Sequence, residues 1–309
     1  MNSADCIAAA AASRQVPGLW ARVSRAWRGL WLFTWKSHLT WRALPGLLVT
    51  LLAIPLLTYF TIEPMQRLAD RAAEQAARRG DQRSGPGAVV RKAAPAGATD
   101  SSQARRPFYH WLIEFYLLLA LPLYCLTTCG PLIRDDLQSA TLVFLLTRPI
   151  SRAWLFGLKY VCQMMWLEAL VAVHGLFLYG AGLARGVPEA ASTMAPFFAA
   201  QFLAVLAWGA LSALLGILTR RYLLLGIGYG FIVEVGIGHI PTNINSLSLT
   251  RHLQGLLGHH PILNELYDWA PQNAGGSVGA LLLGAGLFLA AGALIFTCRE
   301  YHQAAEMQR

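Results

Sequence analysis

The chain alternates between six stretches of mostly apolar residues and the polar segments that separate them. A helix needs about 20 mostly apolar residues to cross the roughly 30 Å of bilayer hydrocarbon. The stretches that meet this length are Leu44–Ile62, Phe108–Cys129, Trp154–Leu183, Ala195–Leu218, Tyr222–Pro241 and Ser277–Cys298. A helix satisfies its backbone polar groups within the segment, as lipid requires. We therefore expect an all-α, polytopic membrane protein with six transmembrane helices.

The polar segments predict how the rest of the chain is organised. An N-terminal segment precedes one transmembrane domain, and a short tail follows it; these are residues 1–43, 44–298 and 299–309. Lys and Arg gather on the cytoplasmic side of membrane proteins. Their distribution favours cytoplasmic termini and a cytoplasmic loop 130–153, with loops 63–107 and 242–276 outside. The many basic residues of loop 63–107 oppose this orientation, so charge alone leaves it open.

Composition agrees with a membrane protein. Hydrophobic residues make up 55% of the 309 residues and charged residues only 13%, about half the charged share of a soluble domain. The net charge is +9, but it lies in short segments between apolar stretches. Such segments fit anionic lipid headgroups, and we expect no nucleic-acid partner.

The N-terminal segment carries a face of tryptophans. At 100° per residue, four indoles fall on one side of a helix and the basic residues Arg22, Arg25 and Lys36 on the other. The four are Trp20, Trp27, Trp31 and Trp35. A helix of this kind lies in the membrane interface, so we expect an interfacial amphipathic helix here. A solvated linker is the alternative.

The loop after the second apolar stretch predicts a short amphipathic helix across the inner membrane surface. Asp135 and Asp136 stand at its start, where carboxylates suit a helix N-terminus, and Ser151 is placed to cap the following helix. Apolar side chains at helical spacing then follow, flanked by arginines. These residues are Leu137, Thr141, Phe144 and Leu145, with Arg134, Arg148 and Arg152. We call residues Arg134–Arg152 the coupling stretch.

The motif in this stretch resembles that of ABC transporter permeases of the second exporter type, the ABC-type-2 membrane protein family. The shared residues are "LLTRPISR" at Leu145–Arg152, with Thr141 before it and Lys159 after it. The chain departs from the family pattern at Ala140, where Gly is usual, at Thr147, where Ser is usual, and at the opening acid, which is Asp. A second similar segment, Tyr229–Leu253, covers the family's fifth span with its Glu.

The resemblance implies a six-span permease subunit of an ATP-driven exporter in a bacterial inner membrane, paired with a second permease subunit. The coupling stretch would dock on a separate ATPase subunit through Arg134, Asp135, Asp136, Leu137, Thr141, Phe144, Leu145, Arg148 and Arg152. The chain has no GxxxxGK[ST] phosphate-binding loop, which agrees with a partner that hydrolyses ATP. The alternative is a surface helix without a partner.

Three ionisable residues lie within the apolar stretches: Glu234 in the fifth, and Glu168 and His174 in the third. Ionisable groups at such depth usually face a bundle interior or a wet path. Each is therefore a candidate for a transport pathway, and a structural hydrogen-bonding role is the alternative. Glu168 and His174 are six residues apart, about 120° around a helix, and do not form a ready pair.

Two other function classes stay open. A non-transporting membrane anchor would need no ATPase, and an intramembrane hydrolase would use Ser277 in "GGSVG". The histidines offer no defined spacing to Ser277. His259 and His260 with Glu265 and Asp268 could gather at a metal, but no HExxH is present. We expect a non-catalytic subunit without metal or cofactor.

Overall fold

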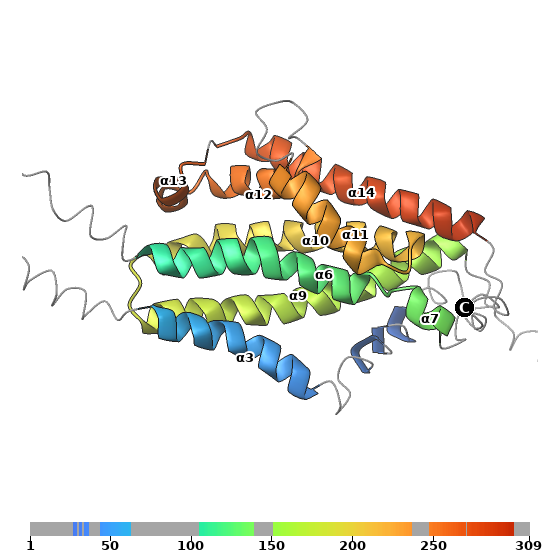
Figure 1. Ribbon diagram of the computed structural model, residues 1–309, viewed down its shortest axis with the longest axis horizontal. Coiled ribbons are helices and arrows are strands. Elements are labelled where there is room, and N and C mark those ends of the chain that lie inside the picture. The colour runs from blue at the N-terminus through green and yellow to red at the C-terminus, as the bar shows by residue number, and fades with distance from the viewer. Residues whose placement is uncertain are drawn as a thin grey trace, which may run out of the picture.

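A computed structural model describes residues 27–29, 31–32, 34–36, 44–62, 105–138, 151–236, 247–269 and 271–299. Within these ranges the chain is mostly helical and contains no strand (Figure 1). The all-α expectation holds for this part of the chain.

Four helices among the described residues are long and apolar enough to cross a membrane: Arg105–Asp136, Arg152–Ala184, Ala190–Leu218 and Ala274–Cys298. The first combines η1 (His110–Ala120, π-helical), α6 (Leu121–Cys129) and α7 (Arg134–Gln138). The others are α9 (Arg152–Ala184), α10 (Met194–Leu218), preceded by the short η2 (Ala190–Thr193), and α14 (Ala274–Cys298). They match four of the six predicted spans, and the chain is a multi-pass membrane protein.

The other two predicted spans are helical but shorter. The first is α3 (Leu44–Thr61), and the fifth is α11 (Tyr222–Tyr229) followed by the π-helical η3 (Gly230–Gly236). Their described apolar helical segments are Leu52–Thr61 and Tyr222–Glu234. α3 has 18 residues, close to the roughly 20 that a span needs, and η3 ends where the described range ends, at Gly236.

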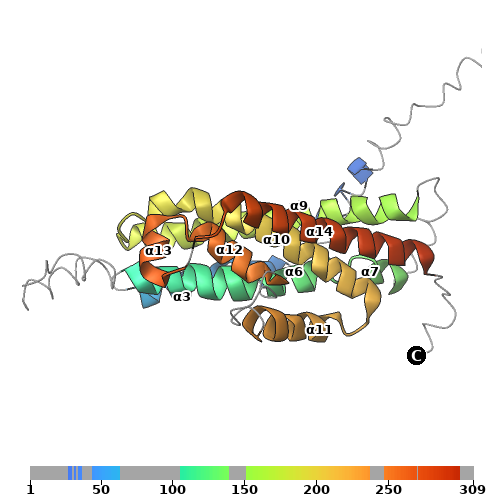
Figure 2. The same cartoon turned by 90° about the horizontal axis from the view of Figure 1, so that it is seen from above.

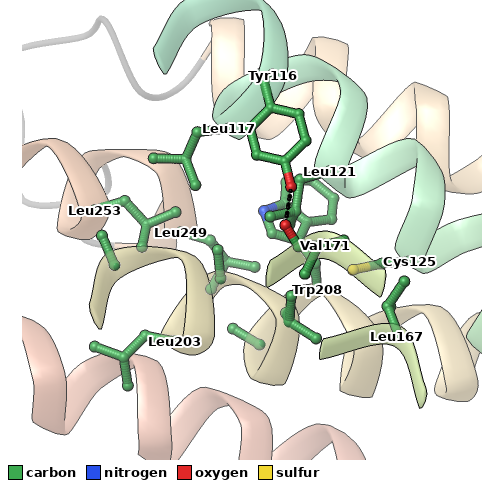
Figure 3. Close-up of a cluster of buried hydrophobic side chains, with 14 of the residues drawn as sticks. Tyr116, Leu117, Leu121, Cys125, Leu167, Val171, Leu203, Trp208, Leu249 and Leu253 are labelled. Atoms are coloured by element: carbon green, nitrogen blue, oxygen red, sulfur yellow. Dashed lines mark hydrogen bonds between the residues drawn. The ribbon is translucent and has the colours of Figure 1, made fainter. Parts of the chain in front are cut away.

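The core of the bundle lies around α10. This helix packs against α6, α9 and α14, while α3 lies along α9 (Figures 1 and 2). Small residues face its neighbours: a Cβ added to Gly216 would meet the backbone carbonyl oxygen of Gly130 at 1.7 Å. Figure 3 shows the apolar core that these helices share, with Tyr116, Leu121 and Trp208 among its buried side chains.

Two short helices, α12 (Leu249–Leu257) and α13 (Pro261–Tyr267), lie between η3 and α14. The apolar stretch of α12 is too short to span a bilayer. Leu249, Leu253 and Leu257 are buried, and the helix packs on α10 and α14. The leucines recur every fourth residue, so they form one apolar face that the bundle covers.

Much of the outer surface is apolar. Leu224, Phe231 and Leu283 are each at least 65% exposed, and α14 is the least buried of the four long helices. A soluble protein rarely leaves such a surface in water, whereas lipid covers it without cost. The apolar exterior therefore agrees with the membrane assignment.

Candidate functional site

The start of the coupling stretch is fixed to α9 by a buried ion pair. Asp136, in the first turn of α7, is 5% exposed and is paired with Lys159 of α9. The Lys159 ammonium also donates a hydrogen bond of 2.8 Å to the backbone carbonyl oxygen of Leu132. We call Leu132, Asp136 and Lys159 the ion-paired corner.

This pairing has an energetic consequence. The carboxylate of Asp136 and the ammonium of Lys159 are both out of water, so each depends on the other for its charge to be tolerated. Removing one partner of such a pair typically costs about 3–5 kcal/mol. The corner therefore holds α7 and α9 in a fixed relation.

Close backbone contact supports the corner from a third helix. A Cβ on Gly130 would meet the Tyr222 ring and the Leu126 carbonyl oxygen, each at 2.5 Å. Together with Gly216, this glycine brings the end of α6 directly against α10. The end of α6 is therefore held tightly against α10, with no room between the two backbones for a larger side chain.

Arg152 closes the same end of the bundle. It is the first residue of α9, and its guanidinium donates to the backbone carbonyl oxygen of Arg299 at 3.2 Å. Arg299 in turn donates to the carbonyl oxygen of Ile217 at 2.8 Å. Ser151 caps α9 by accepting a hydrogen bond from the Trp154 N–H, which confirms the predicted cap.

Most of the remaining coupling stretch lies outside the described residues. Thr141, Phe144, Leu145 and Arg148 lie outside the described residues, and only the backbone of Leu137 is described. Arg134 and Asp135 are the first two residues of α7. The amphipathic helix and its docking role stay predictions.

Deeper in the bundle, four polar residues from three elements lie together. Tyr116 of η1 donates hydrogen bonds to the carbonyl oxygen of Val171, at 2.8 Å, and to the amide oxygen of Gln201 of α10, at 3.4 Å (Figure 3 shows the first). The His174 ring centroid is 4.7 Å from that of Tyr116. We call Tyr116, Glu168, His174 and Gln201 the polar cluster.

Several polar atoms in this cluster lack partners. Glu168 Oε2, His174 Nε2 and Gln201 Nε2 are buried and make no hydrogen bond among the described residues. His174 is 1% exposed and Gln201 is 0% exposed. Buried polar atoms are nearly always hydrogen-bonded, so these three atoms, two of them on the neighbouring side chains of Glu168 and Gln201, mark the cluster as a candidate site.

Glu234 has a different environment. Its carboxylate accepts hydrogen bonds from the Ser248 hydroxyl at 2.6 Å and from the Leu249 and Thr250 N–H groups at 3.0 and 2.8 Å. These donors form the start of α12, where a negative charge is stabilised by the helix dipole. Each of these contacts fits the structural role that the sequence left open as an alternative.

The structure describes three of the four residues of the tryptophan face. Residues 27–29, 31–32 and 34–36 are helical, and the ring centroids of Trp27 and Trp31 are 6.3 Å apart. Trp35 then packs edge-to-face on Trp166 of α9 at 4.8 Å. The indoles therefore share one side, as predicted, and contact the bundle; Trp20 lies outside the described residues.

The remaining candidates are isolated. Ser277 Oγ is buried without a hydrogen-bond partner in the described part of the chain, so it lacks there the adjacent base that activates a serine nucleophile. His259 contacts the Gln272 carbonyl oxygen. In the described ranges, no three His, Cys, Asp or Glu residues gather as a metal site would require.

The roles of two site residues, Lys159 and Gln201, were not predicted from the sequence. Lys159 was aligned with a family lysine, but its pairing with Asp136 joins elements 23 residues apart and leaves no periodic signal. Gln201 is the only amide side chain among the 25 residues of α10, and its position among mostly apolar residues indicated a buried polar contact.

Comparison with known proteins adds no identity to this geometry. No protein-family model matches the chain, and no curated protein matches its sequence. The functional significance of the ion-paired corner and the polar cluster therefore rests on their chemistry and on the motif of the coupling stretch.

Proposed function

We propose that this chain is the permease subunit of an ATP-driven ABC exporter. In this proposal α3 and α11–η3 complete six spans, both termini are cytoplasmic, and the tryptophan segment lies at the inner surface of a cell membrane. A separate ATPase subunit and a second permease subunit complete the transporter. The motif shared with the ABC-type-2 permeases supports this class.

The ion-paired corner is the observation that carries the proposal. The lysine of the motif, Lys159, binds Asp136 in the first turn of the coupling stretch and the carbonyl oxygen of Leu132 just before it. A partner that moves the coupling stretch would therefore move α9 with it. Through the Gly130–Gly216 contact the same movement reaches α10, the most central helix.

The geometry also fits an energy source outside the chain. In Figures 1 and 2, α7 lies at the same end of the bundle as the C-terminal end of α14, opposite to α13. With the termini in the cytoplasm, this end faces a soluble ATPase. An apolar helix face with charged ends, as predicted for residues Arg134–Arg152, suits insertion into a groove on such a partner.

Purification from the native membrane in mild detergent tests the proposal. We expect a second chain with a GxxxxGK[ST] loop to copurify, and the complex to hydrolyse ATP. A preparation without such a chain and without ATP turnover would contradict the transporter and favour a membrane anchor.

Cysteine labelling in intact cells tests the orientation. A cysteine at Ser84→Cys is expected to react with a membrane-impermeant thiol reagent, because loop 63–107 is placed outside. A cysteine at Arg309→Cys is expected to react only after the membrane is opened. The reverse pattern would invert the topology.

A further inference from the structure

Glu168 sits in the middle of α9 without a counter-charge. Its Oε2 is buried and has no hydrogen-bond partner among the described residues. The helices α3, α10 and α14 all pack against α9. None of the three contains a Lys, Arg, His, Asp or Glu residue.

The ionisable groups around Glu168 cannot neutralise a carboxylate. Tyr116 and Cys125, on η1 and α6, lie close enough to interact with it electrostatically, and both become anions when they ionise. Tyr124 of α6 faces the His174 ring instead, with 6.1 Å between the centroids. None of these three side chains supplies a positive charge.

Two basic groups share α9 with Glu168 away from the helix ends. Lys159 is nine residues away, about 14 Å along the helix axis, and it is already paired with Asp136. His174 is six residues away, about 9 Å along the axis, and is packed between two tyrosine rings.

Arg28, which lies beside Met165, and Lys36, which follows the Trp35–Trp166 contact, are basic groups of the N-terminal segment near α9. Within the described residues neither forms an ion pair with Glu168, so an ionised Glu168 would be an unpaired charge in a membrane-spanning helix.

Such a charge is costly, and a buried acid usually takes up a cation or becomes neutral. The site is tightly packed: a Cβ on Gly175 would meet the Phe198 ring at 2.9 Å and the Gln201 amide oxygen at 3.2 Å. A proton needs no cavity, whereas an ammonium group or a metal ion does. We propose that Glu168 carries a proton at neutral pH and that the polar cluster is a proton-exchange site.

The chemistry of this site is a simple proton transfer. A hydronium ion delivers one proton to a carboxylate oxygen of Glu168 and is left as water, and the same oxygen later returns the proton to water, which becomes hydronium. Water reaches Glu168 only when the packing around it opens transiently, and the Nε2 atoms of His174 and Gln201 then offer it hydrogen bonds. This proposal depends on the membrane character of the bundle and not on ATP-driven transport.

Infrared spectroscopy of the purified full-length protein in lipid nanodiscs tests this directly. A neutral carboxylic acid has a C=O stretching band that a carboxylate lacks. We expect this band in the wild-type protein at neutral pH, its loss in Glu168→Gln, and its retention in Glu234→Gln. Glu234 is the matched control, because it too lies in an apolar helix but accepts three hydrogen bonds.

A second variant keeps the test decisive even when Glu168→Gln does not fold. Gln201→Leu leaves Glu168 in place and removes its polar neighbour, so the band is expected to shift in frequency and to persist. A wild-type protein without the band at neutral pH overturns the proposal. So does a band that survives Glu168→Gln, or one that Gln201→Leu leaves unchanged.

Discussion

The ion-paired corner holds an acidic side chain with a counter-charge, and the polar cluster holds one without. At the corner, Asp136 is matched by Lys159, which also binds the Leu132 carbonyl oxygen. In the cluster, Glu168 has no counter-charge, and three buried polar atoms are left without partners. Among the described residues the charges of the corner are balanced, and the carboxylate of the cluster is not.

This difference separates a region that fixes two helices to each other from a region that can change its protonation state. A paired and buried charge fixes two helices to each other, because separating the pair exposes both charges to an apolar surrounding. An unpaired acid has two states of similar packing, with and without a proton, and can change between them without moving a helix. The corner therefore suits transmission of movement, and the cluster suits uptake of a proton.

The largest effect is expected where one member of the pair is removed. Lys159→Met leaves Asp136 buried and uncompensated, so we expect a loss of about 3–5 kcal/mol in stability. Thermal unfolding in mild detergent measures this through the buried thiols Cys125, Cys129 and Cys162, which become reactive when the bundle opens.

The double variant Asp136→Leu/Lys159→Met is the control for this prediction. It removes both charges, and replacing a buried pair by apolar groups is often close to neutral. Most of the lost stability should therefore return. A double variant as unstable as Lys159→Met would mean that packing of the lysine stem, and not the charge pair, holds the corner.

A smaller effect is expected for the third acidic side chain, Glu234. Glu234→Ala leaves the Ser248 hydroxyl and the first N–H groups of α12 without their acceptor, so we expect a loss of about 1–3 kcal/mol. The same unfolding assay applies. An unchanged midpoint would show that α12 does not depend on this carboxylate and would reopen a pathway role for Glu234.

The smallest effect is expected at Glu168. Gln has nearly the shape of a protonated Glu and carries no charge, so Glu168→Gln should change stability by less than about 1 kcal/mol, the scale of one net hydrogen bond. The matched substitution Asp136→Asn removes a paired charge and should be clearly more harmful. Equal losses for the two variants would erase the distinction between corner and cluster.

The sequence predicted the membrane class of this fold well because long apolar segments are read directly from composition. Four of the six stretches are helices of spanning length. The boundaries moved by a few residues at the starts of the second and last helices, which begin at Arg105 and Ala274. The predicted end at Cys129 is the last residue of α6. The sequence also predicted the N-terminal cap of α9, because Ser151 caps the helix through a hydrogen bond from a residue only three positions later.

Contacts between distant segments could not be read in the same way. Asp136 was placed as a helix-start carboxylate, but the position of Lys159 opposite it depends on how α7 folds back on α9. The hydrogen bonds of Glu234 depend on α12, which begins 15 residues later. The pattern along one helix shows that a polar residue is buried, and only the packing shows which partner it finds.

The docking of an ATPase on the coupling stretch is the central claim, and one substitution tests it most directly. Phe144→Asp places a charge on the predicted apolar anchor, whose burial against a partner would contribute about 1.5–3 kcal/mol. Phe144 lies outside the predicted spans, so we expect the membrane helices to stay intact. Leu247→Asp is the control, because Leu247 is 65% exposed on the loop predicted to lie outside.

The measurement is ATP turnover, together with the amount of ATPase subunit retained on the purified membrane protein. The account predicts that Phe144→Asp loses both, while Leu247→Asp keeps both at the wild-type level. Full retention and turnover in Phe144→Asp would contradict it, because the coupling stretch would then not be where the ATPase binds.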